Sequence, residues 1–417
     1  MESLLAPLFP ENYLRRMSRI FLMLVLGAAL LAVQGDDLDL DAPFHRYRER
    51  TPQDRFSKIK PSLENGTLLL DRSSELAFLG SVLKALEVPA SSQMLVFSTT
   101  SLQLSLINPR NPRALYFNED TYVGFIPGGK IEIISLDPEL GAIFHIFDIP
   151  RGSGPIVAER SSRCMNCHSG SASRFVPGLV ILSVVPGPTG GSLESFRSDE
   201  SGHAIPFADR FGGWYLTGAE GFTNHWANTV GRMKEGQITR TALQFGEQFN
   251  PARYPRPASD LLAHLLHEHQ AGFVNRVVEG SYRARALLHR GEDLSALKDL
   301  AREITRYLLF ADEAPLPAPV PGDPVFKCDF RSNRQTDAQG RSLKDFDLST
   351  RLFKYRCSYM IYSPVFTGLP AEFKEMIFAE MAGALTGHDQ AFAYLAEEER
   401  AAIRSILNAT LEQKRRW

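Results

Sequence analysis

Cysteine is scarce in this sequence, which has four cysteines and three tryptophans among 417 residues. With so few cysteines, a chance pair at a functional spacing is improbable, so a motif that contains one is informative. Charge is nearly balanced, with a formal net charge of −2, and nothing indicates a nucleic-acid partner. Beyond residue 33 no apolar run is long enough to span a bilayer, so no stable membrane span is expected after the first 35 residues. The composition is otherwise that of an ordinary globular chain.

Two of the four cysteines, Cys164 and Cys167, form the motif CMNCH together with His168. C-x-x-C-H is the signature of covalent c-type haem attachment. Two thiols on one tight turn each add to a vinyl group at the same haem edge, and the next residue lies beneath the porphyrin as proximal iron ligand. The sequence therefore predicts one haem c per chain, with His168 on the iron. Because the motif occurs once and no internal repeat is found, a multihaem wire is excluded.

Two other uses of this cysteine pair fit less well. A thioredoxin-like redox pair requires C-x-x-C at the start of a helix that follows a strand, and it needs no histidine next to it. A zinc site requires two further ligands, and the region supplies none at a recognisable spacing.

The first 35 residues have the pattern of a secretory signal peptide. A basic segment around Arg15 and Arg16 precedes an apolar run over residues 20–33, and the small residue Gly35 suits cleavage. The apolar run is short for a membrane span, although an uncleaved N-terminal anchor is the alternative. Export predicts a periplasmic protein, and c-type haem is attached outside the cytoplasm.

The rest of the chain predicts an α+β fold, with a β-rich half that carries the haem turn and a mostly helical C-terminal half. Residues 93–149 combine β-branched and aromatic residues with turn signals, which indicates strands, and helical periodicity appears at 73–86 and again over 258–286. We therefore expect a haem-attachment domain over 36–255 and a helical domain over 256–417 that packs on it. Three local expectations complete this picture: an irregular segment over 36–60, a strand over 175–185, and a hairpin followed by a loop over 210–229.

A six-coordinate haem needs a second axial ligand, and two histidines are candidates. On the helix predicted at 258–286, His269 falls at the centre of the apolar face, whereas His264 and His267 are predicted to point toward the polar face. His225 lies in a loop dense in aromatic and amide groups, which suits a haem pocket. The sequence does not choose between His269, His225 and an open iron position.

Other polar residues and cysteines give further expectations. Arg163 and Arg174 flank the motif and are candidates to pair with haem propionates. His203 stands in a polar loop and is expected to be solvated. The remaining thiols, Cys328 and Cys357, are expected to form a disulfide in an oxidising compartment, with two unpaired buried thiols as the alternative.

Several strings resemble a family of large exported cytochrome c-domain proteins with a single haem in mid-chain. The resemblance covers about residues 85 to 400 and implies haem binding and redox use through Cys164, Cys167 and His168. The sequence departs from the family pattern at 218–221, where GAEG replaces a Thr-His-Gly turn and its histidine is absent. The strings that carry the resemblance are ALYFNEDTYVGFIPGG, CMNCH, GGWYLTGAEG with HWAN, LHEHQ and RSLKDFDLSTRLFKYRCSYMIYS.

Two functions compete on this basis. The first is an exported electron carrier, in which His168 and a distal histidine hold the iron and the partner is a periplasmic redox protein. The alternative is a periplasmic haem oxidoreductase, peroxidase- or oxidase-like, that keeps the distal iron position open for a small-molecule substrate. Size favours the alternative, because a carrier with one haem needs only about a hundred residues. A haem-based sensor is a third, weaker interpretation.

Overall fold

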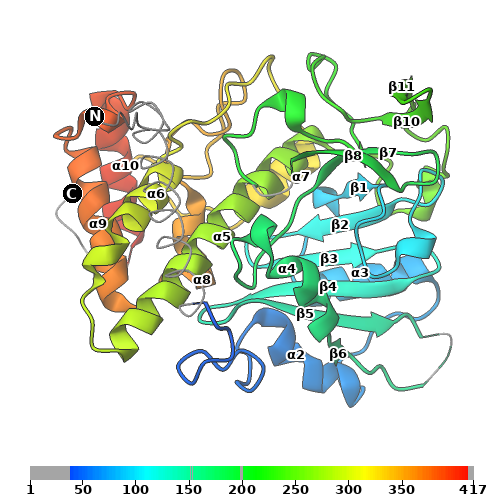
Figure 1. Ribbon diagram of the computed structural model, residues 1–417, viewed down its shortest axis with the longest axis horizontal. Coiled ribbons are helices and arrows are strands. Elements are labelled where there is room, and N and C mark those ends of the chain that lie inside the picture. The colour runs from blue at the N-terminus through cyan, green and yellow to red at the C-terminus, as the bar shows by residue number, and fades with distance from the viewer. Residues whose placement is uncertain (1–37, 151, 153, 198–200, 412–417) are drawn as a thin grey trace, which may run out of the picture.

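The computed structural model describes residues 38–150, 152, 154–197 and 201–411. The predicted signal peptide lies outside the described residues. The expected α+β class is confirmed, because a β-rich part precedes a helical part along the chain (Figure 1). Within the described residues, no helix is long and apolar enough to cross a membrane.

A seven-stranded sheet forms the centre of the β-rich part, and each neighbouring pair of strands is antiparallel. Short turns join the consecutive strands between residues 113 and 148, and Gly128 and Gly141 take the positive φ angles that two of these turns require. The order across the sheet is β6-β5-β4-β3-β2-β1-β9. The strands are β1 (Met94–Val96), β2 (Arg113–Phe117), β3 (Thr121–Phe125), β4 (Lys130–Asp137), β5 (Gly141–Asp148), β6 (Glu159–Arg160) and β9 (Trp214–Tyr215).

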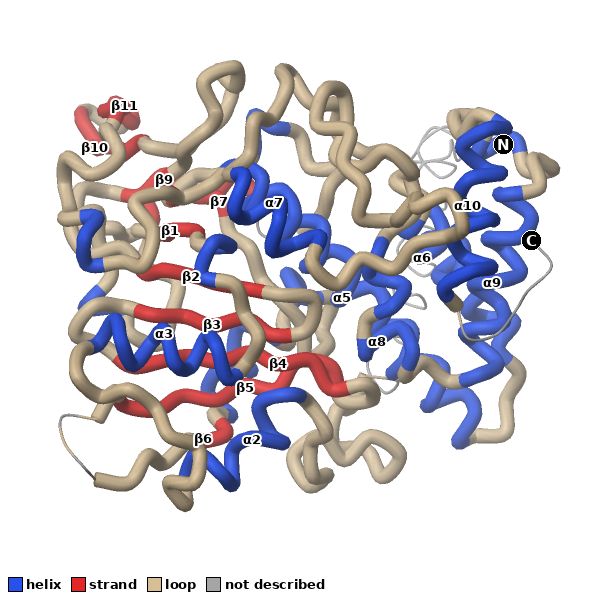
Figure 2. Tube along the Cα trace, turned by 180° about the vertical axis from the view of Figure 1, so that it is seen from behind, coloured by secondary structure: helices blue, strands red, loops and turns tan. Residues whose placement is uncertain are grey.

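The two faces of this sheet are covered differently. Helices α2 (Arg55–Glu64) and α3 (Glu75–Ala85) lie on one face, where side chains such as Tyr116, Val123 and Phe125 are fully buried (Figure 2). The opposite face, called here the inner face, lies toward α4 (Met165–His168) and α5 (Leu261–His289), as Figure 1 shows. The α3 helix confirms the periodicity at 73–86, and the side chain of Ser74 caps its N-terminus.

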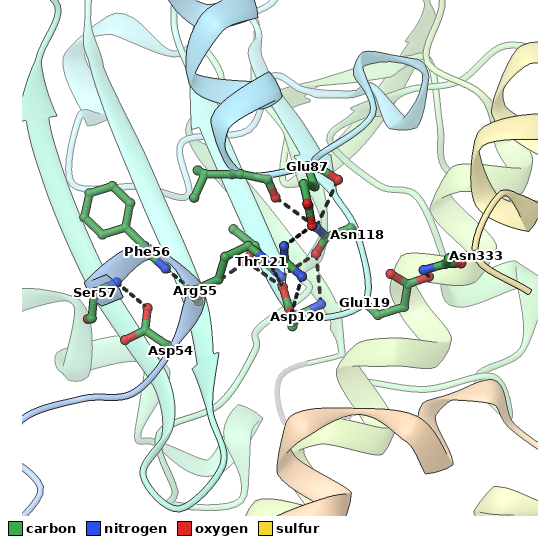
Figure 3. Close-up of polar contacts among 12 residues, drawn as sticks. Asp54, Arg55, Phe56, Ser57, Glu87, Asn118, Glu119, Asp120, Thr121 and Asn333 are labelled. Carbon is green, nitrogen blue, oxygen red and sulfur yellow. Dashed lines mark hydrogen bonds and ion pairs between the residues drawn. The ribbon is translucent and has the colours of Figure 1, made fainter. Parts of the chain in front are cut away.

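The turn between β2 and β3 is held from two sides. On one side, Arg55 of α2 donates two hydrogen bonds to the carboxylate of Asp120, at 2.9 and 3.0 Å. On the other side, the amide of Asn333 donates a hydrogen bond to the carboxylate of Glu119 at 3.4 Å (Figure 3). Asp54 caps α2 by accepting a hydrogen bond from the backbone of Ser57. The expectation of irregular structure over 36–60 is therefore wrong from residue 55 onward, because this cap starts a helix there.

Two small hairpins extend the β-rich part. One pairs β7 (Ser183–Pro186) with β8 (Ser192–Arg197), and the other pairs β10 (Thr229–Lys234) with β11 (Gln237–Ala242). The strand expected over 175–185 is therefore mostly irregular. The hairpin expected over 210–229 is not formed there, because that range holds only the two residues of β9 and the first residue of β10. These segments are rich in glycine and proline, so their backbone conformation follows tertiary contacts more than local propensity.

The long helix α5 confirms the helical prediction at 258–286 and runs between the sheet and the other helices (Figure 1). It contacts α6 (Lys298–Leu308), α8 (Pro364–Thr367) and α9 (Ala371–Leu385) on the side away from the sheet. The polar face predicted for α5 is wrong, because His264 and His267 are 5% and 8% exposed. Its residues that are not buried are Arg276, Arg283, Arg285, Leu288 and His289.

The C-terminal part is completed by α7 (Pro324–Arg331) and α10 (Glu397–Thr410). One apolar cluster continues from Met94 and Tyr122 of the sheet to residues of α9 and α10. The expected division at residue 256 falls inside this shared core, and the two-domain description stays a prediction.

Candidate functional site: the C-x-x-C-H turn

The motif lies on a short helical turn that is anchored to the core. A 3-10 turn over Ser162–Cys164 leads into α4, and Met165 is buried in the apolar cluster shared with the sheet. The hydroxyl of Ser169 donates to the carbonyl of Met165 at 2.7 Å and closes the turn. This conformation leaves Cys164 half-buried and Cys167 exposed, with His168 half-buried beside them.

The ring of His168 is held by one of its two nitrogens. Its Nδ1 lies 2.9 Å from the carbonyl oxygen of Gly178, and its ring packs on Phe144 of β5 at a centroid distance of 4.8 Å. A carbonyl only accepts, so Nδ1 carries the hydrogen and the lone pair is on Nε2. Burial lowers the pKa of His168 to about 4, which keeps the ring neutral at neutral pH. Among the described residues Nε2 has no hydrogen-bond partner, so it has the form that a metal ligand requires.

The two cysteines of the motif are unpaired in the structure. Burial raises the pKa of the Cys164 thiol, and a hydrogen bond from the side chain of Ser161 opposes this effect. Two free thiols on one turn, next to a histidine with a free Nε2, are the chemical groups that covalent haem attachment uses.

The inner face of the sheet next to this turn is incompletely covered. Leu115, Ile134 and Ile146 point to this face and are partly exposed, while their neighbours in each strand are buried against α2 and α3. Arg113 and Glu132 form an ion pair at 3.4 Å on the same face. These partly exposed apolar side chains, on the face where the His168 ring packs on Phe144, are of the kind that contacts a porphyrin ring.

His269, one of the two predicted distal ligands, uses both ring nitrogens elsewhere. Its Nδ1 lies 2.8 Å from Nδ1 of His203, its Nε2 lies 2.7 Å from the hydroxyl of Ser358, and the residue is 0% exposed. Its ring also stacks on Phe310 at 4.5 Å. In this arrangement neither nitrogen of His269 is free to bind iron. His203, expected to be solvated, is instead 2% exposed, so that expectation is wrong.

His225, the other predicted distal ligand, lies half-buried in its loop. Its Nδ1 accepts a hydrogen bond from the backbone of Ala227 at 3.1 Å, and its ring meets Phe211 edge-on at 6.0 Å. Burial lowers the pKa of His225, and a hydrogen bond with the backbone of Phe222 opposes this. The structure therefore ties this ring to its own loop, and a role for His225 on the iron stays a prediction.

Sequence reasoning placed His267 on the polar face, yet its ring lies against the inner face of the sheet. The centroid of its ring lies 5.5 Å from that of Phe117 on β2 and 5.6 Å from that of Tyr122 on β3. His264, one turn earlier, bonds the hydroxyl of Ser259 at 3.0 Å through Nε2. The string LHEHQ could have indicated this, because four consecutive polar residues inside an apolar helix suggest a helix with more than one buried face.

The two arginines near the motif differ in their contacts. Arg163 is exposed, and among the described residues no hydrogen bond or ion pair involves its side chain, so pairing with a propionate stays a prediction. Arg174 instead forms ion pairs with Glu279, on α5, and with Glu303, at 3.0 Å, on α6. This network joins the residues after the motif to the helical part.

The predicted disulfide between Cys328 and Cys357 is wrong, because both cysteines are unpaired. Cys328 is exposed on α7, whereas Cys357 is fully buried, and burial raises the pKa of its thiol. Spacing in the sequence did not show that the two side chains lie in such different environments.

Within the described ranges, no group of three or more His, Cys, Asp or Glu residues is arranged to hold a metal ion. A haem supplies four of its own nitrogens to the iron, so its protein ligands are the axial side chains only. No protein-family model, curated protein or solved structure is found to match the chain.

Proposed function

We propose that this protein is an exported c-type haem protein that transfers single electrons, with one haem bound through Cys164 and Cys167. The observation that carries the proposal is the state of His168, whose Nδ1 is fixed by the carbonyl of Gly178 while its Nε2 keeps a free lone pair. The haem supplies a one-electron redox couple when bound. The chain's own residues orient the ligand, cover the porphyrin with apolar side chains and exclude water from part of it.

The exposure of Cys167 supports an electron carrier. A thioether bond to this exposed residue keeps one edge of the cofactor at the molecular surface, where a periplasmic partner protein exchanges electrons with it. Neutral histidine nitrogen is a suitable iron ligand for this role.

A second candidate, a haem oxidoreductase with an open iron position, is favoured by one observation. The charges of Arg113 and Glu132 lie close enough to both Cys164 and His168 to influence their pKa values. A charged pair beside an iron position can polarise a small-molecule ligand, and the polarity of the distal pocket decides between ligand activation and electron transfer.

The test is expression of the full chain in a host that attaches c-type haem. We expect coloured protein whose pigment survives acid–acetone extraction, with one haem per chain. Cys164→Ala and Cys167→Ala should each reduce or abolish covalent attachment, while the control Cys328→Ala should leave it intact. Colourless protein, or pigment that is extracted completely, contradicts the proposal. Carbon monoxide or cyanide binding by the untreated protein favours the oxidoreductase over the carrier.

A further inference from the structure

We infer that His267 is the second axial ligand of the iron, on the side opposite His168. This inference rests on the proposed haem function and adds the identity of the ligand. Nothing in the motif points to His267, and the placement of α5 against the inner face of the sheet assigns it.

His168 and His267 lie over the two ends of one row of side chains. Phe144 of β5 is paired with Ile134 of β4, Ile134 with Tyr122 of β3, and Tyr122 with Phe117 of β2. The His168 ring packs on Phe144, and the His267 ring packs on Tyr122 and Phe117.

The spacing of this row suits two axial ligands. Phe144 and Tyr122 are two strands apart, about 10 Å, which is enough for two imidazole rings with an iron atom between them. Ile134 stands between the two histidines in the row and is partly exposed, so the apolar side chains that pack against it do not cover it completely.

His267 also differs from other buried histidines in the hydrogen bonds of its ring nitrogens. It is 8% exposed, and in the described part of the chain no hydrogen bond of its ring nitrogens is found, although neither nitrogen is among the fully buried polar atoms without a partner. His264, His269 and His225 each have at least one. The ring nitrogens of His267 are therefore available to bind a metal.

Another histidine of the sheet, His145, has a buried Nδ1 without a partner, but it is excluded by position. Its ring packs at 4.7 Å on Phe56 of α2, on the opposite face of the sheet. His267, unlike His145, packs on the face that carries the haem-attachment turn.

The test uses the full haem-loaded protein, with absorption and electron paramagnetic resonance spectra as readouts. We expect a six-coordinate, low-spin ferric iron in the wild type and a high-spin iron in His267→Ala. Added imidazole should restore the low-spin state in this variant. The matched control is His264→Ala, which removes a buried histidine one turn away on the same helix and should keep the low-spin spectrum.

If His267→Ala does not fold, His267→Met keeps most of the volume and offers a thioether ligand. It should remain low-spin with a higher reduction potential. A low-spin iron in His267→Ala, or a high-spin iron in the wild type, overturns the inference. Colourless wild-type protein instead overturns the proposed function, so the two failures are distinguishable.

Discussion

The side-chain amide of Asn275 forms two hydrogen bonds with the backbone of Leu179, to its N–H and to its carbonyl, each 2.8 Å long. Leu179 follows Gly178, whose carbonyl holds the ring of His168. The long helix α5 thus fixes the segment that orients the proposed proximal ligand. Gly178 allows this close approach, because a Cβ there would lie 2.3 Å from Oδ1 of Asn275.

Replacing Asn275 with alanine should therefore affect both stability and the haem. Loss of its amide leaves two buried backbone groups of Leu179 unpaired, and we expect a loss of about 2–4 kcal/mol in the free energy of unfolding. His168 should also become less well oriented, which would appear as a mixture of spin states. Urea unfolding and the absorption spectrum measure the two effects. The control is Asn408→Ala, on the exposed side of α10, which should change neither the stability nor the absorption spectrum. Equal stability of the two variants would show that the Asn275 amide does not stabilise the segment at Leu179.

The hydrogen-bonded pair of His269 and His203 predicts a pH dependence of stability. Burial lowers the pKa of His269 from 6.5 to about 3, so in acid the unfolded chain binds a proton that the folded chain does not. The stability that this difference supports is present above pH 6.5 and falls, at about 1.4 kcal/mol per pH unit, as the pH drops from 6.5 toward 3.

His269→Gln removes this titrating group. The free energy of unfolding of this variant should be lower than that of the wild type at pH 7. Between pH 6.5 and 4.5 it should decline less steeply than that of the wild type. Chemical unfolding at a series of pH values gives both slopes. Parallel curves for the two proteins would show that His269 does not titrate in this way.

Larger side chains on the two faces of β4 should have different effects, because the two faces are covered differently. Ile134 points to the incompletely covered inner face, whereas Ile133 is 1% exposed and packs toward α2 and α3. Ile133→Trp should overpack a filled core and lower the free energy of unfolding by about 1–3 kcal/mol.

Ile134→Trp should instead preserve the fold and reduce the haem content, because the new ring occupies the space between His168 and His267. Circular dichroism checks the fold, and the ratio of haem absorbance to protein gives the content. Full haem content in Ile134→Trp would show that the porphyrin does not lie over this face.

The free thiols give a prediction that needs no variant. In the haem-loaded protein Cys164 and Cys167 are consumed, so a thiol reagent should modify Cys328 alone in the folded state and both Cys328 and Cys357 after unfolding. The reason is burial, because Cys357 is 0% exposed. Mass spectrometry after labelling without reductant counts the modified residues. If Cys328 and Cys357 are both unreactive in the unfolded, unreduced protein, they form a disulfide and are not free thiols.

Much of the fold was predictable because its elements have strong local signals. Strands at 93–149 followed from β-branched and aromatic residues between turns, and α3 and α5 followed from helical periodicity. The segments 175–185 and 210–229 failed because their glycines and prolines leave the backbone conformation to tertiary contacts.

The histidines show where sequence reasoning reached its limit. An amphipathic pattern assigns one face of a helix to the core and one to solvent, but α5 is buried by the sheet on one side and by helices on the other. The pattern therefore places His267 on the polar face and makes His269 a candidate iron ligand. In the structure the hydrogen bonds of His269 to His203 and Ser358 leave neither of its nitrogens free to bind iron.

The sequence by itself determined the attachment chemistry that we propose, because two thiols and an imidazole on one turn are a local arrangement that spacing alone specifies. Only the tertiary structure decided which other histidine packs on the inner face of the sheet and which cysteines remain apart. Those relations join residues about a hundred positions apart, such as His168 and His267, and they depend on how a helix packs across a sheet, which no local pattern encodes.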